Sequence, residues 1–151
     1  MLEHPSFNLM VVANRTCPCP GLADEVLARI DGRDGRVHLV APALNSRLRH
    51  WTSDIDGAVR LARERLGVAV DLLGQAGVTA TGEVGDADPL VAMEDALHAF
   101  EAHAVLISTW PAGRSNWLER NLLERARARF DLPIDHTVSR QGLELPGLTA
   151  A

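Results

Sequence analysis

Five short apolar runs recur along the chain and constrain its fold more than any other feature. They begin at intervals of about 25 to 40 residues and cover 7–13, 37–41, 78–84, 104–107 and 134–138. Each run has the length of a strand, and the segments between the runs have the apolar spacing of helices. Strands that alternate with helices pair in parallel through right-handed crossovers. The pattern therefore predicts a three-layer α/β/α sandwich around a five-stranded parallel sheet.

Four segments between these runs have the periodicity of amphipathic helices. The clearest covers 55–73, and Gly77 is expected to end it as a C-cap. A third helix is expected to begin at Asp88, whose side chain suits an N-cap. The first, at about 22–30, is the least regular, and the last is expected to start at Ser115. The buried residues of the last helix are expected to be Leu118, Leu122, Leu123, Ala126 and Phe130.

Length and charge limit the kinds of function that the chain can have. At 151 residues with 46% apolar content, one domain is expected, over 7–139, followed by a C-terminal tail at 140–151. The formal net charge of −5 argues against a nucleic-acid partner, which would need a basic face. All fifteen basic residues are arginines. This excludes mechanisms that need a Schiff-base or P-loop lysine.

The sequence also predicts a cytoplasmic protein without a membrane anchor. No apolar run approaches the ~20 residues that span a bilayer, and the N-terminus lacks a basic region followed by an apolar core. Cys17 and Cys19 stand one residue apart, which is not the pattern of a secreted disulfide framework. The six histidines are scattered without ligand spacing, so no metal is expected.

Three loops are candidates for a ligand site. Ligands of such sheets bind beyond the carboxyl ends of the strands, where the strand order reverses. The loops that follow the first, second and fourth runs read ANRTCPCPG, ALNSRLRHWTSD and STWPAGRSN. All three tryptophans, Trp51, Trp110 and Trp117, lie in or beside two of these loops. This clustering favours a site there, although partial burial of Trp51 against the neighbouring helix is an alternative.

Polar residues in the first and fourth loops could hold an anion. Backbone amides at a helix N-terminus and the guanidinium of Arg114 would surround the turn at Gly113, with Arg15 opposite. The predicted ligand-binding residues are Asn14, Arg15, Thr16, Ser108, Thr109, Gly113, Arg114, Ser115 and Asn116. Two alternatives stay open. The arginines could simply be solvated while Ser115 only caps a helix, or the region could be an interface.

Several motifs resemble the universal stress protein family over roughly residues 7–139. The matching segments are LMVVANRT, GEVGDADP and VLISTWPAGRS, and STWPAGRSNWLER and RFDLPIDH look like a divergent actinobacterial branch. The resemblance implies the fold of adenine nucleotide alpha hydrolases with strand order 3-2-1-4-5. It also implies a stress-associated role and a homodimer that pairs through the last strand, 134–138.

The chain departs from the ATP-binding motif of that family. The motif has a glycine, two residues, a glycine, nine residues, then a glycine followed by Ser or Thr. Aligned on Gly113, this chain has Trp110, Leu123 and Glu124 at the other positions. A carboxylate about 4 Å from a phosphate repels it by ~1 kcal/mol in water and ~4 kcal/mol at an effective dielectric constant of 20. Standard ATP binding is therefore not expected. No cofactor is assigned, and ATP or another nucleotide stays open as an alternative.

No catalytic residue is assigned from the sequence. The GxSxG turn of hydrolases is absent, and His136 lies on the expected edge strand. Asp86 and Asp88 could approach a ligand, but the cap role of Asp88 is favoured. The leading prediction is a small-molecule or anion-binding protein. The alternatives are a structural interaction module with a vestigial pocket and an enzyme that acts on a nucleotide-like substrate.

Overall fold

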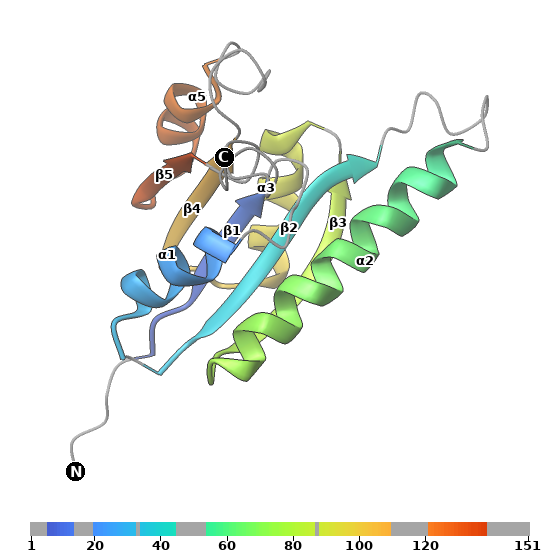
Figure 1. The fold of residues 1–151 in the computed structure, drawn as a ribbon. Coiled ribbons are helices and arrows are strands. Elements are labelled where there is room, and N and C mark those ends of the chain that lie inside the picture. Colours follow the sequence, from blue (N-terminus) through green and yellow to red (C-terminus); the bar gives the residue numbers. More distant parts are fainter. Residues whose placement is uncertain are drawn as a thin grey trace, which may run out of the picture.

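Five parallel strands form one sheet at the centre of the molecule (Figure 1). The structure is a computed structural model, and it describes residues 6–13, 20–32, 34–44, 54–86, 88–109 and 121–138. The strands are β1 (Leu9–Ala13), β2 (Arg36–Leu44), β3 (Thr79–Asp86), β4 (Ala104–Thr109) and β5 (Ile134–Val138). They pair in the order β3-β2-β1-β4-β5. The predicted fold and strand order are confirmed.

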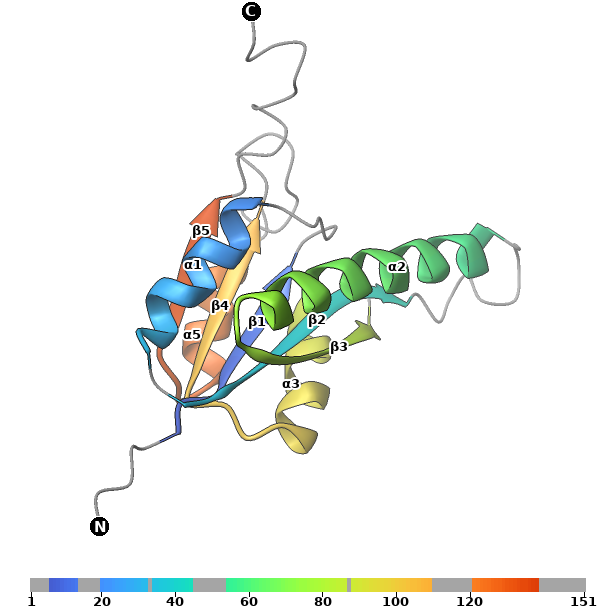
Figure 2. The ribbon, with the colours of Figure 1, turned by 60° about the horizontal axis from the view of Figure 1, so that its bottom comes forward.

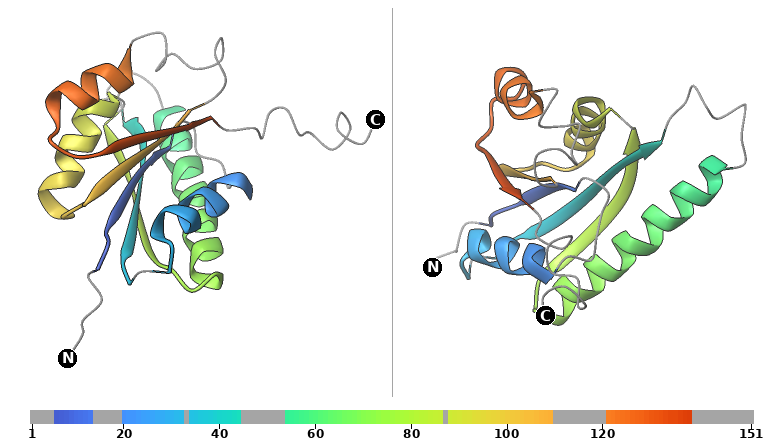
Figure 3. Two further views of the ribbon diagram at one scale, coloured as in Figure 1. Left: turned by 90° about the vertical axis from the view of Figure 1, so that its left-hand side faces the viewer. Right: turned by 45° about the horizontal axis from the view of Figure 1, so that its top comes forward.

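Helices cover both faces of the sheet. On one face lie α1 (Pro20–Ile30) and α2 (Asp54–Gln75), and on the other lie α3 (Pro89–Ala99) and α5 (Leu122–Arg129) (Figures 2 and 3). Each face has its own apolar core. Leu39 and Leu66 belong to the core under α1 and α2, whereas Val40 and Met93 belong to the core under α3 and α5.

The central strand explains why the sequence pattern identified the sheet. All five residues of β1 are buried, because side chains of successive residues enter opposite cores. Val11 packs in the core under α1 and α2, and Val12 packs in the core on the other face. A parallel strand that is covered on both sides is apolar throughout, so it appears as a continuous run.

The long helix α2 ends as its sequence predicts. Gly77 has a φ of +88°, which favours glycine. Its N–H donates to the Gly74 carbonyl at 3.0 Å, and the Val78 N–H donates to the Leu73 carbonyl at 2.9 Å. These two bonds are those of a Schellman motif. The motif turns the chain directly into β3, so the predicted C-cap is confirmed.

The two helices on the other face agree with the sequence only in part. Asp88 caps α3, because its Oδ1 accepts the Leu90 N–H at 3.0 Å. The helix α5 begins at Leu122, directly after Asn121, whose backbone is left-handed with φ 55° and ψ 41°. The expected unbroken helix from Ser115 to Phe130 is therefore wrong at Asn121, because a right-handed helix contains no left-handed residue. The predicted start lies outside the described residues.

The burial expected for that helix is confirmed where the structure describes it. Leu122 and Ala126 are buried, and Leu123 and Phe130 are partly buried against the same core. Leu118 lies outside the described residues. Spacing of apolar side chains therefore located the buried face of the helix correctly, even though it did not show the interruption.

Candidate functional site

The strand order reverses between β1 and β4, and this point defines the candidate site. The chain moves from β1 outward through β2 to β3, and then returns to the other side of β1 to form β4 and β5. Ala13, the last residue of β1, lies beside Ser108 of β4, which in turn lies beside Thr137 of β5. Connections that leave β1 and β4 diverge to opposite faces, so this edge is where such folds form a ligand crevice.

Ser108 occupies the centre of this edge. Its side chain and backbone are only 5% exposed, and among the residues that the structure describes it is the only buried polar one. On β4, Leu106 packs in the core under α1 and α2, whereas Ile107 packs in the opposite core. Alternation along the strand therefore directs Ser108 to the α1 side. A hydroxyl at this point can both donate and accept a hydrogen bond.

The other predicted ligand residues lie almost entirely outside the described part of the chain. Thr109 ends β4 opposite Val138. The remaining seven, Asn14, Arg15, Thr16, Gly113, Arg114, Ser115 and Asn116, lie outside the described residues, as do the three tryptophans and both cysteines. Because β1, β2 and β4 are parallel, the loops that follow Ala13, Leu44 and Thr109 begin at one edge of the sheet.

The two aspartates at the end of β3 and just after it, Asp86 and Asp88, hold a turn. Asp86 Oδ1 accepts the N–H of Asp88 at 2.8 Å, while the Asp88 carboxylate accepts the Leu90 N–H. Each carboxylate therefore stabilises the connection from β3 into α3. The favoured interpretation of Asp88, as a helix cap, is confirmed.

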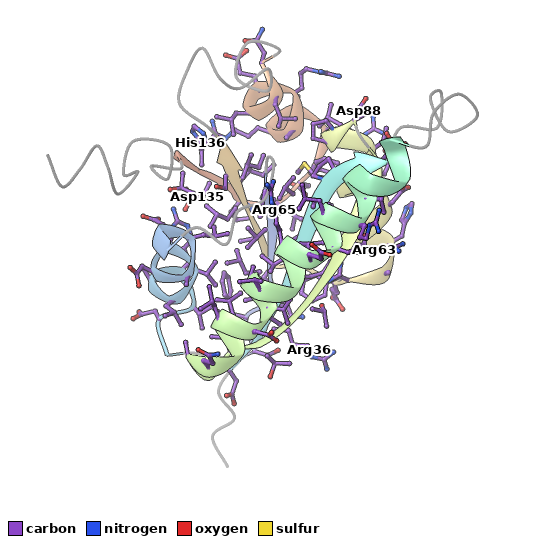
Figure 4. The ribbon with its side chains drawn as sticks, turned by 45° about the vertical axis from the view of Figure 1, so that its right-hand side comes forward. Arg36, Arg63, Arg65, Asp88, Asp135 and His136 are labelled. Atoms are coloured by element: carbon purple, nitrogen blue, oxygen red, sulfur yellow. The ribbon has the colours of Figure 1, made fainter. Side chains whose placement is uncertain are left out.

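His136 lies near this edge but on the opposite face from Ser108. It is the neighbour of Ile107 in the β4–β5 pairing, so it faces α5 (Figure 4). Burial of the ring, and then the positive charge of Arg127, lower the pKa of the His136 imidazole below its usual 6.5. Because His136 and Ser108 face different sides of the sheet, they do not form a base and nucleophile pair.

The position of Arg127 beside His136 was not predicted from the sequence. Its guanidinium donates to the Ile134 carbonyl, with Nη2 at 3.0 Å. The sequence signal is the short connection between α5 and β5, which brings the end of the helix back over the strand that follows. This contact fixes a cation above the β5 edge.

A second polar cluster lies on the α3 side of the sheet, nearer the amino ends of the strands than Ser108. The spacing of residues in the sequence did not predict it. His38 Nδ1 is 2.7 Å from Thr81 Oγ1, and His38 Nε2 is 3.4 Å from Glu83 Oε2. The imidazole also stacks on Phe100, with ring centroids 5.2 Å apart. The cluster joins β2 to β3. His38 lies beside Met10, three residues before Ala13 in β1. The cluster is therefore separate from the edge where the strand order reverses.

A cavity of about 390 Å³ lies at the other end of the sheet. Its lining residues are Phe7, Leu9, Arg29, Ala104, Val105, Pro133, Ile134 and Asp135. Arg29 Nε donates to Asp135 Oδ2 at 3.0 Å, and the same guanidinium is paired with Glu25. The charged groups of this cavity therefore already neutralise each other. The cavity lies at the amino ends of β4 and β5, away from Ser108.

The described residues form neither a metal cluster nor a membrane-spanning helix. No group of three or more His, Cys, Asp or Glu side chains among them could hold a metal ion. In that same part of the chain, no helix combines the length and apolarity needed to cross a membrane.

Comparisons with known proteins support the fold. Neither a protein-family model nor a curated protein sequence matches the chain. A crystal structure of a protein from the universal stress protein family from Burkholderia pseudomallei is similar, with a TM-score of 0.61 and 15% sequence identity. The similarity covers 87% of this chain and 96% of that protein. The chain therefore has the universal-stress-protein-like α/β fold that its motifs predicted.

Proposed function

We propose that this chain is a universal-stress-protein-like binding protein that holds a small anion or nucleotide-like ligand at the carboxyl ends of β1 and β4. The observation that carries the proposal is the coincidence of two features. The strand order reverses between these two strands, and buried Ser108 lies at the edge where it reverses. A stress-associated role in the cytoplasm belongs to the same proposal.

The chemistry of the loops that begin at this edge suits an anion. Arg15 and Arg114 follow β1 and β4 in the sequence, and charge-assisted hydrogen bonds to an anion contribute roughly 1.5 to 3 kcal/mol each. Ser108 would add a hydroxyl from the end of β4. Glu124, in the first turn of α5, favours a ligand with less negative charge than ATP, because a nearby carboxylate repels phosphate.

Thermal unfolding in the presence of candidate ligands tests the proposal. ATP, AMP, inorganic phosphate and sulfate would each be added to the purified protein over a range of concentrations. A ligand at 100 times its Kd adds about 2.7 kcal/mol. For a domain of this size, that free energy raises Tm by roughly 5 to 10 °C. We expect at least one of the four to produce such a shift.

Three variants then locate the site. Arg114→Ala and Ser108→Ala should each reduce the ligand-induced rise in Tm. Arg125→Ala is the matched control, because Arg125 is an exposed arginine on α5 and should leave that rise unchanged. The binding proposal fails if no ligand raises Tm. It also fails if Arg114→Ala and Ser108→Ala show the same ligand-induced rise as the wild type and the control. The interaction-module interpretation would then be preferred.

A further inference from the structure

Among the strands that the structure describes, β3 lies at one edge of the sheet and is the longer of the two edge strands. It has eight residues, compared with five in β5. In the described part of the chain, its hydrogen-bonded neighbour is β2. Proteins often protect such edges with charged residues, above all Lys, with Pro or with short length. β3 reads TATGEVGD, without lysine or proline. Its two carboxylates have partners within the chain, because Glu83 pairs with His38 and Asp86 accepts the Asp88 N–H. Its outward backbone N–H and C=O groups can therefore pair with a further strand.

Beside this edge, one side of α2 presents a stripe of four residues, two of which are glycines. Arg63, Gly67, Val70 and Gly74 follow one another at spacings of four, three and four, which places them on one side of the helix. A Cβ added to Gly82 of β3 would lie 3.5 Å from Val70 Cγ2, so the stripe runs along the β3 side of α2. Figure 4 shows Arg63 on that side and Arg65 on the other.

Among the described residues, nothing packs against the two glycines of the stripe. A Cβ at Gly67 or Gly74 would meet nothing within 4 Å, and the positive-φ glycines of the described residues are Gly32 and Gly77. Each glycine inside a helix costs about 0.5 to 1 kcal/mol relative to alanine. Glycine also permits close approach of another backbone. Their position beside an open strand points to an approaching helix.

Arg63 in the stripe and Asp71 beside it have charges that are complementary to those of an antiparallel copy of α2. Arg63 and Asp71 are exposed and make no ion pair with the described residues. The last turn of α2 carries no basic residue, although cations there are favourable to the helix dipole. When two α2 helices pack antiparallel, Arg63 of each lies near the last turn and Asp71 of the other.

We propose that β3 pairs with β3 of a second copy of this chain, antiparallel, about a two-fold axis at Gly82. Gly82 lies under Leu66 and Val70, so the same axis passes between Gly67 and Val70 of the two α2 helices. Thr81 then lies across from Glu83 of the partner subunit, and Ala80 across from Val84 of the partner subunit. One axis therefore aligns both the strands and the helices, and the contact closes as a dimer.

This interface differs from the dimer through β5 that the sequence resemblance predicts. β5 offers five residues, and Asp135 on it is engaged by Arg29. Use of both edges would extend the sheets without closure, because two sheet-extending axes on opposite edges generate an open array. The two interfaces are thus alternatives, and an experiment must separate them.

Sedimentation velocity over a range of concentrations tests the α2 part of the interface. The wild type should reach a mass of twice 16.3 kDa. Gly67→Arg should raise the dimer Kd at least tenfold, because an added cation faces the partner's stripe, and Gly74→Arg should do the same opposite Arg63. The control is Val68→Arg, since Val68 is exposed one position along the helix and about 100° around it. Thermal melts identify any variant that does not fold.

Hydrogen exchange tests the strand part of the interface. Alternate amides of 79–86 should become protected as concentration rises, whereas amides of 134–138 should not. A wild type that stays monomeric at all concentrations overturns the proposal. It is also overturned by a dimer that withstands both Gly67→Arg and Gly74→Arg, and by protection at 134–138 in place of 79–86. The last result would establish the β5 dimer instead.

Discussion

Gly35 lies where the start of β1 passes close to the start of β2, and it provides a sharp test of the structure. A Cβ added there would lie 1.8 Å from the Phe7 carbonyl oxygen and 2.7 Å from its carbon. Both atoms are backbone, so the clash cannot be relieved by a side-chain rotation. The Phe7 N–H also donates to the Asp34 carbonyl at 2.7 Å. Gly35→Ala must therefore displace Phe7 and weaken this hydrogen bond.

The expected cost has two parts. Overpacking costs typically 1 to 3 kcal/mol, and loss of a hydrogen bond costs roughly 0.5 to 1.5 kcal/mol. Gly35→Ala should therefore lower the free energy of unfolding by about 2 to 4 kcal/mol, measured by urea denaturation with circular dichroism. Gly57→Ala is the control, because a Cβ there meets nothing within 4 Å, and it should be neutral or slightly stabilising. A Gly35→Ala protein within 0.5 kcal/mol of the wild type would refute the close approach of Phe7 and Gly35.

Three further predictions concern other parts of the fold. Asp88→Ala removes the bond to Leu90 N–H and should cost about 1 kcal/mol in urea denaturation, whereas Asp88→Asn should retain most of the stability. Met93 is fully buried, and Met93→Ala should cost about 2 to 5 kcal/mol by the same assay. Burial and Arg127 lower the pKa of His136, so the unfolded state binds the proton more tightly. The free energy of unfolding should then fall as pH drops below about 6.5 and level off below the folded pKa. His136→Gln should remove that part of the pH dependence, and an unchanged profile between pH 7.5 and 5 would contradict the assignment.

The parts of the fold that the sequence predicted are those in which side-chain pattern and local geometry agree. β1 is apolar because both of its faces are buried, and Gly77 and Asp88 end and begin helices through hydrogen bonds to nearby backbone. Asn121 was missed because one left-handed residue does not disturb the apolar spacing around it. Contacts between distant residues were also missed. His38 and Thr81 meet only because β2 and β3 pair in a particular register, and a single sequence does not contain that register.

The candidate site was predicted only as far as its framework. The strand ends that carry it, at Ala13 and Ser108, were expected from the alternation of runs and from the rule that ligands bind where strand order reverses. The identity of a ligand depends instead on the geometry of loop side chains, which hydrophobic periodicity does not determine. The fold could therefore be predicted in more detail than the chemistry.

Leu123 and Glu124 bear on both the fold and the chemistry of the site, since they stand where the ATP-binding motif has its last glycine and its hydroxyl residue. In the structure Leu123 packs against the core under α3 and α5, so the position contributes to folding. Glu124 is exposed, so Glu124→Ser should leave stability nearly unchanged.

If phosphate binds near Glu124, Glu124→Ser removes a repulsion of at least ~1 kcal/mol between the carboxylate and the phosphate. This free energy corresponds to a Kd for ATP about fivefold lower than that of the wild type. Asp131→Ser is the matched control, because it removes one exposed negative charge from the turn after α5 and should not change the Kd. Isothermal titration with ATP measures both. Equal Kd values for the two variants would show that Glu124 does not face the ligand, and the alignment of this segment with the ATP-binding motif would be wrong.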